Sequence, residues 1–457
     1  MSNTKSTALT EGSIPKQIIG FAIPLFLGQM FQQFYNMADS LIVGNFLGDE
    51  ALASVTSTGS LIFLLVGFFN GTAMGAGVVI SRYFGAKQYE KVRIAVHTDV
   101  AFGIVSGIVM SIIGVLFTPQ ILKWMGTPSD VFPNSVMYLR VYFCGSLAVV
   151  LYNVCKSILQ AVGDSKRPLY YLIVSSVVNI ILDLLFCGLF RLGVEFAALA
   201  TILSQFLSLA LCMGRLMKIE EVYQIHLKEI CMEKEMLKQI ISIGLPSGVQ
   251  NSIISIANVV VQSNINAFGT AAMAGCGSYS KIEGFGFLPI TCFSMALTTF
   301  VGQNLGAKQY DRVKKGAIFG IVCAITLAET MGVFIYTFAP QLIPLFGGDV
   351  ETVSYGVLQA RTVTLFYFLL SFSHASAAIM RGAGKSTVPM IVMMISWCGI
   401  RITYITLIAK QFGNIQMVFF AYPITWSISS VIFLVYLLKA DWMHNFERQE
   451  VKECVLD

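Results

Sequence analysis

The chain has 457 residues, of which 56% are hydrophobic and only 12% are charged, and its mean hydropathy is +0.73. A soluble globular domain carries roughly 25% charged residues, so this composition excludes that class and favours a protein that spans a lipid bilayer. The formal net charge of +5 is spread over many short polar segments rather than one patch, which argues against a nucleic-acid partner.

Long apolar segments follow one another along the chain, and a helix of about 20 such residues is enough to cross a bilayer. The first one is long and is followed by no small-residue cleavage site, so we predict a membrane helix there rather than a cleaved signal peptide. The predicted fold class is an all-α polytopic membrane protein. Its twelve transmembrane helices are predicted over 17–46, 51–80, 94–118, 134–158, 168–190, 194–217, 238–267, 272–300, 316–344, 354–380, 388–409 and 414–438.

Lys and Arg residues concentrate in every second connection between these helices. The connections that are rich in them are 81–93, 156–167, 215–238 and 308–315. The intervening connections hold only Lys123, Arg191 and Lys410. By the positive-inside rule, the basic connections face the cytoplasm, and both termini then lie there too.

The chain contains an internal repeat. The decapeptide FGAKQYEKVR (84–93) returns as LGAKQYDRVK (305–314), 221 residues later, and QAVGDSKRP (160–168) returns as RGAGKSTVP (381–389). Each copy holds six helices, so both copies start on the same side of the membrane and form a parallel repeat, as in many transporters. We predict an N-terminal lobe over 1–217, a cytoplasmic linker over 218–237, and a C-terminal lobe over 238–457 that ends in a short cytoplasmic tail.

Two carboxylates, Asp39 and Asp183, lie inside the apolar spans. An ionisable side chain at the centre of a bilayer costs about 2.5–3.5 kcal/mol on insertion scales, so it needs a partner, a wet cavity or a function. Tyr35 and Asp39 share one face of the first helix, and Asn179 and Asp183 share one face of the fifth. Thr201 adds a hydroxyl from the sixth helix.

If these three helices pack together, the five side chains form one pocket of oxygens. Na⁺ prefers such oxygens, and two close carboxylates also suit a shared proton. At the 221-residue offset, Asp183 corresponds to Tyr404 and Asn179 to Ile400, so the acids belong to the first half only. This asymmetry favours a function over a structural hydrogen-bond network, which is the alternative. The candidate ligands of Na⁺ are Asp39, Asn179, Asp183 and Thr201.

Other polar residues of the spans are candidates for the lining of a substrate cavity. Gln32 lies on the same stripe as Asp39, and Gln205 follows Thr201 by one turn. Glu283 either faces the cavity or pairs with Arg361 or Arg401. The sequence assigns no role to Lys281, His374, Arg361 or Arg401.

The sequence resembles the MATE family, the multidrug and toxic compound extrusion transporters. The resemblance rests on the two six-helix halves, the GAKQY loops, QAVGDSKRP, MADSLIVGNFLG (37–48) and the segment NIILDLLFCGLFRLGVEFAALATILSQ (179–205). It implies a V-shaped, two-lobe exporter of a bacterial inner (plasma) membrane, which expels cationic or amphipathic small molecules in exchange for H⁺ or Na⁺. It also implies that the cation or proton site is formed by Tyr35, Asp39, Asn179, Asp183 and Thr201.

The chain departs from some branches of that family in its seventh helix. Ile254 stands where those branches carry a Glu, which shifts the expected coupling toward the N-terminal lobe. We expect no cofactor besides the coupling ion, a monomer, and partners limited to small-molecule substrates and the lipid bilayer.

Two other functions compete with an antiporter. A flippase for lipid-linked saccharides has a related architecture, but its anionic cargo favours a cleft rich in Arg and Lys. Here the intramembrane cations are only Lys281, Arg361 and Arg401, all in one half. A membrane enzyme has less support, because only His374 lies well inside a span and no zincin, nucleophile-elbow or phosphate-loop motif is present.

Overall fold

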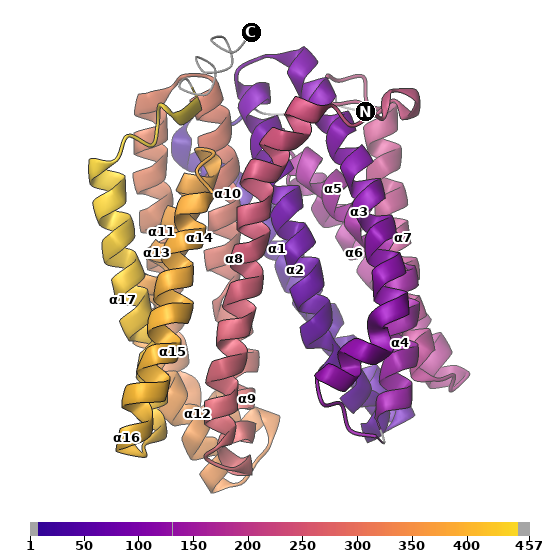
Figure 1. Ribbon diagram of the computed structural model, residues 1–457, viewed down its shortest axis with the longest axis vertical. Helices are drawn as coiled ribbons and strands as arrows, with labels where there is room; N and C mark the ends of the chain where they lie inside the picture. Colours follow the sequence, from indigo (N-terminus) through magenta and orange to yellow (C-terminus); the bar gives the residue numbers. More distant parts are fainter. Residues whose placement is uncertain (1–7, 130, 447–457) are drawn as a thin grey trace. The chain divides into compact units, whose positions relative to one another are not determined.

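The computed structural model describes residues 8–129 and 131–446, and helices make up nearly all of this part of the chain (Figure 1). The first half contains α1 (Ile14–Leu47), α2 (Asp49–Gly85), α3 (Tyr89–Trp124), α4 (Phe132–Cys144), α5 (Ser146–Ala161), α6 (Lys166–Asp183), the π-helix η1 (Leu184–Leu189), α7 (Val194–Lys218) and the short η2 (Leu227–Glu229).

The second half repeats this order with more breaks. It contains α8 (Lys234–Asn266), α9 (Thr270–Gly286), α10 (Leu288–Gly306), α11 (Tyr310–Leu342), η3 (Ile343–Phe346), α12 (Val350–Val363), η4 (Thr364–Phe366), α13 (Tyr367–Gly382), α14 (Thr387–Met393), η5 (Met394–Ile400), α15 (Arg401–Thr403), η6 (Tyr404–Ala409), α16 (Lys410–Phe412) and α17 (Ile415–Lys439). Of these, η5 and η6 are π-helices.

The predicted all-α membrane fold is confirmed. Within the described ranges, ten helical segments are long and apolar enough to cross a membrane, and the pair α4–α5, bent by 49°, makes an eleventh. Together with α2, which has 37 residues, these segments follow the twelve predicted spans in chain order. Apolar composition over such lengths leaves helices as the structure that satisfies every backbone hydrogen bond inside a bilayer.

The chain packs as two compact units, and the boundaries between them fall inside two helices. Unit 1 contains Leu27–Gly248, whereas unit 2 contains Leu9–Phe26 and the chain from Val249 onward. The first part of α8 therefore packs within unit 1, and the first part of α1 within unit 2. The predicted lobes, 1–217 and 238–457, follow the sequence repeat rather than the packing, and they stay a prediction.

The internal repeat is visible in the backbone of the connecting turns. Lys87 and Lys308, equivalent in the two GAKQY loops, both adopt a left-handed conformation with φ of 57°. The following residues close the same bond, from Gln88 N–H to the Tyr83 carbonyl at 3.0 Å and from Gln309 N–H to the Asn304 carbonyl at 2.9 Å. This is the Schellman type of helix end, which satisfies carbonyls that the helix leaves free. The two loops thus end their helices in the same way.

Unit 1 contains an unusually close crossing between α2 and the first part of α8. A Cβ atom built on Gly71 would lie 2.3 Å from the Gly248 nitrogen, and one built on Gly75 would lie 2.4 Å from the Gly244 Cα. Glycines four residues apart on both helices let the two backbones touch, as in membrane helix pairs with small residues at the contact. Beyond this crossing, α3 packs against α4 and α5, and α7 packs against α6.

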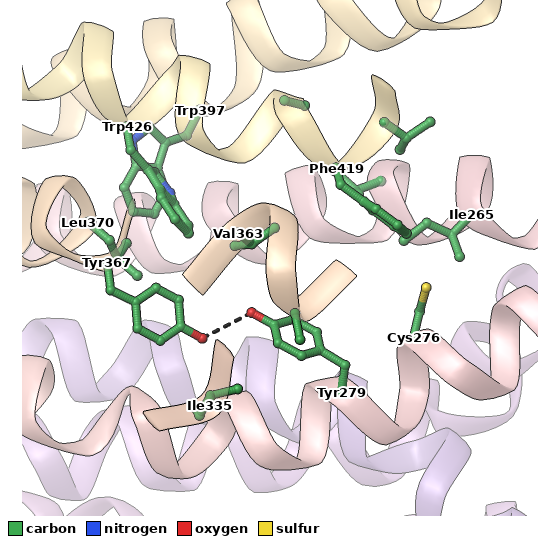
Figure 2. Close-up of a cluster of buried hydrophobic side chains, with 14 of the residues drawn as sticks. Ile265, Cys276, Tyr279, Ile335, Val363, Tyr367, Leu370, Trp397, Phe419 and Trp426 are labelled. Carbon is green, nitrogen blue, oxygen red and sulfur yellow. Dashed lines mark hydrogen bonds between the residues drawn. The ribbon is translucent and has the colours of Figure 1, made fainter. Parts of the chain in front are cut away.

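Unit 2 is organised around a buried aromatic cluster. The hydroxyl groups of Tyr279 on α9 and Tyr367 on α13 hydrogen-bond at 3.0 Å, and both side chains are fully buried (Figure 2). The helix α17, which lies beside α13 and α14, contributes Trp426, whose ring meets that of Tyr367 at 6.3 Å (Figure 1). Where α13 begins, the Glu329 carboxylate accepts a hydrogen bond from the Phe368 N–H at 3.0 Å, so this acid serves a helix break.

Candidate functional site

The two acids of the first half meet inside unit 1. Asp39 on α1 and Asp183 at the end of α6 lie close enough for one carboxyl group to hydrogen-bond to the other. Asp183 is fully buried and Asp39 is partly buried. In the described part of the chain, no donor reaches either oxygen of Asp183 or the buried Oδ1 of Asp39. Buried carboxyl oxygens without donors are costly, so this pair is an unsatisfied site rather than a completed network.

Tyr35 joins the acids through its position one turn before Asp39. Its hydroxyl lies within hydrogen-bonding reach of the side chains of Gln32 on α1 and Gln205 on α7, and near the charges of both acids. The structure thus brings together Gln32, Tyr35, Asp39, Asp183 and Gln205 in one region of unit 1. The buried Oε1 of Gln205 has no hydrogen-bond partner among residues 8–129 and 131–446.

Asn179 and Thr201 occupy the same helices but make no printed contact with the acid pair. Asn179 is 1% exposed, lies one helical turn before Asp183, and neither polar atom of its amide finds a partner in the described ranges. The Thr201 hydroxyl donates to the Ala197 carbonyl at 3.2 Å, one turn back along α7, which leaves its oxygen free to accept or to ligate. Their predicted role as ligands stays a prediction.

The backbone changes its geometry immediately after Asp183. The π-helix η1 begins at Leu184, so the wider helical turns start directly behind the carboxylate. Single π-helical segments are rare and occur frequently at functional sites, where they displace the register of a helix by about one residue. Here the change separates the face that bears Asn179 and Asp183 from the end of the span.

Tyr138 and Tyr142 are site residues that the sequence reasoning missed. Both lie on α4 and are 6% and 7% exposed. The Tyr138 phenol lies within electrostatic range of Asp39, Asp183 and Tyr35, and the Tyr142 phenol within range of Tyr35. The available signal was the i, i+4 spacing of the two tyrosines in YLRVY, which places them on one face of a helix.

The arrangement can hold one positive charge. A proton on one carboxyl group would let it donate to the other, and Na⁺ would be ligated by the same carboxylate oxygens with amide and hydroxyl oxygens around them. Two close, negatively charged carboxylates repel each other strongly in a medium of low dielectric constant, so the pair favours occupancy by a cation.

Glu283 belongs to unit 2 and is separate from the acid pair. Its Oε1 accepts a hydrogen bond from the Tyr279 hydroxyl at 3.2 Å, and the Arg401 charge lies within electrostatic range. Lys281 is exposed and lies over the Phe346 ring at 5.4 Å, so it points to other neighbours. Of the two pairings considered for Glu283, the structure therefore favours Arg401.

Comparison with known proteins agrees with this architecture. The MatE family model matches residues 24–185 and again residues 246–407, once in each repeat. "Probable multidrug resistance protein YoeA" of Bacillus subtilis is 30% identical over 438 residues, which cover 93% of this chain and 94% of the relative. "Multidrug export protein MepA" of Staphylococcus saprophyticus is 24% identical and covers 79% of this chain and 80% of its own.

Solved structures show the same fold. A multidrug resistance MATE family transporter of the MOP superfamily, in an outward-facing conformation, matches with a TM-score of 0.90 at 24% identity over 97% of this chain and 99% of that one. A MOP superfamily transporter from Pyrococcus furiosus, described by the reverse polarity of its binding pocket, matches with a TM-score of 0.89 at 25% identity over 95% and 98%. With both halves matched by one family model, the chain is a multi-pass membrane transporter that belongs to the MATE (MatE) family.

Proposed function

We propose that the protein is a secondary antiporter that exports cationic or amphipathic small molecules in exchange for H⁺ or Na⁺. The carrying observation is the pair Asp39 and Asp183, which is buried in unit 1 with oxygens that no donor of the described chain reaches. The name of the 30% identical relative, a multidrug resistance protein, supports drug export as the class of transport.

The coupling ion binds between the two carboxyl groups, and Asn179, Thr201 and Tyr35 complete its surroundings. Binding neutralises the repulsion of the acids and therefore shifts unit 1 between two arrangements, since an ion moves an equilibrium by as much as its affinities for the two states differ. Alternating access of the two halves then exchanges ion for substrate. A membrane potential of 100 mV supplies about 2.3 kcal/mol per charge, enough for roughly 50-fold accumulation.

The flippase alternative has less support from the side chains of unit 2. Arg361 is exposed on α12 and lies over the Tyr336 ring at 5.7 Å, and Arg401 is 1% exposed and already bonded to neutral side chains. Cations held in this way do not form the open basic surface that a diphosphate cargo requires.

The test uses purified protein in liposomes loaded with a fluorescent lipophilic cation. A Na⁺ gradient and a pH gradient are imposed separately, and we expect one of them to drive efflux by the wild-type protein. Asp39→Asn should abolish gradient-driven efflux, because an amide holds neither the proton nor the charge. Glu329→Gln is the matched control, since this acid only accepts a backbone hydrogen bond. Unimpaired coupling in folded Asp39→Asn would refute the assignment.

A further inference from the structure

Arg401 is the most deeply buried charged side chain of unit 2 that the structure describes. It is 1% exposed, and its Nη2 and Nε donate to the Thr425 hydroxyl oxygen at 2.9 and 3.3 Å. Its Nη1 donates to the Asn258 side-chain oxygen at 3.4 Å. The guanidinium also lies over the rings of Trp397 at 5.3 Å and Tyr422 at 4.7 Å. Neutral oxygens and aromatic faces thus surround a full positive charge.

The internal repeat places Arg401 at the counterpart of Asn179. Buried residues of α6 match buried residues of the second half at an offset of 221 residues as far as Ser176 and Trp397. The π-helix η5 then adds one residue to the register. Beyond it the buried positions match at 222, which is also the offset between the two family-model matches. Asn179 therefore corresponds to Arg401, and Asp183 to Ile405, rather than to Ile400 and Tyr404 as the constant offset predicts.

The neighbours of Arg401 are counterparts of the unit 1 site as well. The buried positions of α7 and α17 match at 221, so Thr201 corresponds to Tyr422 and Ser204 to Thr425. Asn258 lies on α8, the counterpart of α1, which carries Asp39. In unit 1 these three helices present acids and uncommitted oxygens, whereas in unit 2 they present a cation whose donors are engaged.

An acid lies within electrostatic range of this cation without forming an ion pair with it. No salt bridge of Arg401 is found in the described ranges, but its charge and that of Glu283 act on each other. Glu283 accepts from the Tyr279 hydroxyl, which in turn meets the Tyr367 hydroxyl at 3.0 Å (Figure 2). Unit 2 therefore holds a fixed positive charge and a nearby negative charge that balances it.

We propose that Arg401 is a tethered cation, which holds in unit 2 the place that H⁺ or Na⁺ takes in unit 1. An arginine stays protonated at any physiological pH, so this place is never vacated. Unit 2 then keeps its ion-bound packing throughout the cycle, and only unit 1 responds to the coupling ion. This inference rests on the proposed role of Asp39 and Asp183.

The test removes the tether and supplies the cation from solution. Arg401→Ala should lower the apparent Tm of the detergent-solubilised protein by about 5–10 °C, because the partners of a buried charge are left unsatisfied. Methylguanidinium should restore the Tm with a saturable dependence on its concentration. In liposomes the same variant should export a lipophilic cation about tenfold more slowly than wild type and regain that rate with methylguanidinium, by analogy with the cost of truncating one partner of a buried charge pair.

Two further variants separate charge from packing. Arg401→Met keeps most of the volume without the charge, and Arg401→Lys keeps a charge; we expect the Lys variant to unfold at the higher temperature and to export faster. Arg361→Ala is the control, since this exposed arginine makes no buried contact, and methylguanidinium should not change its Tm.

Specific outcomes overturn the proposal. If Arg401→Met is as stable as wild type and exports at the same rate, the side chain only fills space. Absence of methylguanidinium rescue in Arg401→Ala, or a Met variant more stable than the Lys variant, overturns it too. A wild-type protein that fails to couple to any gradient would refute the proposed function instead, and the rescue of Tm, which needs no transport, reports on Arg401 by itself.

Discussion

The crossing of α2 and α8 predicts a sharp difference between two glycine substitutions. In Gly71→Ala the new Cβ would lie 2.3 Å from the Gly248 nitrogen, 2.4 Å from its Cα and 2.7 Å from the Ser247 carbonyl carbon. Carbon atoms pack at about 3.5–4.0 Å, so the two backbones must separate by more than ~1 Å. Overpacking of this kind costs about 1–3 kcal/mol, against a gain of about 0.5–1 kcal/mol from replacing a helical glycine.

We therefore expect Gly71→Ala to destabilise unit 1 by about 1–2 kcal/mol, or a Tm lower by roughly 3–6 °C. Thermal unfolding followed with a thiol-reactive dye measures this, because Cys155, Cys187 and Cys212 are buried and react only on unfolding. Gly214→Ala on α7 is the matched control, since a Cβ there meets nothing within 4 Å in the described structure, and its Tm should rise slightly. A Gly71→Ala protein as stable as Gly214→Ala would refute the backbone contact.

Two further predictions concern the acid pair and the linker. Asp183→Asn should raise the Tm while it abolishes coupled efflux, because its amide can donate to Asp39 and a hydrogen bond to a charged group contributes about 1.5–3 kcal/mol; a lower Tm in the same dye assay would contradict an unsatisfied pair. In the linker, the hydrogen bond from Arg93 lowers the pKa of Glu229 below its usual range. A lowered folded pKa means that this contact stabilises the linker above the ordinary Glu pKa of about 4.3 and is lost as the pH falls through the lowered value. Proteolysis of the 219–233 segment should accelerate below about pH 4 in wild type and be insensitive to pH in Glu229→Gln.

Much of the fold was predictable because its signals are local. Hydropathy over about 20 residues decides whether a segment spans a bilayer, and the predicted spans follow the observed helices in order. The repeat was equally readable, since the same turn residues produce the same helix ends at Lys87 and Lys308. The spacing of Tyr35 with Asp39 and of Asn179 with Asp183 predicted which side chains share a face.

The approach of Asp39 to Asp183 could be stated only as a condition, because it depends on how α1 packs near α6. Tyr138 and Tyr142 escaped notice for the same reason, since nothing in α4 shows that it faces the acids. The constant offset also failed beyond η5, where one residue of π-helix moves Arg401 into the place of Asn179.

By itself, the sequence determined the class of the protein, the order of its spans, the duplication of its six-helix unit and the presence of acids where lipid would reject them. These properties depend on composition and short-range periodicity. The tertiary structure decided which of those acids meet, where α1 and α8 divide between the packed units, and that a buried arginine stands in the second half where the first half holds its site. Each of these depends on contacts between helices that are distant in the chain, and such contacts leave no mark in local sequence.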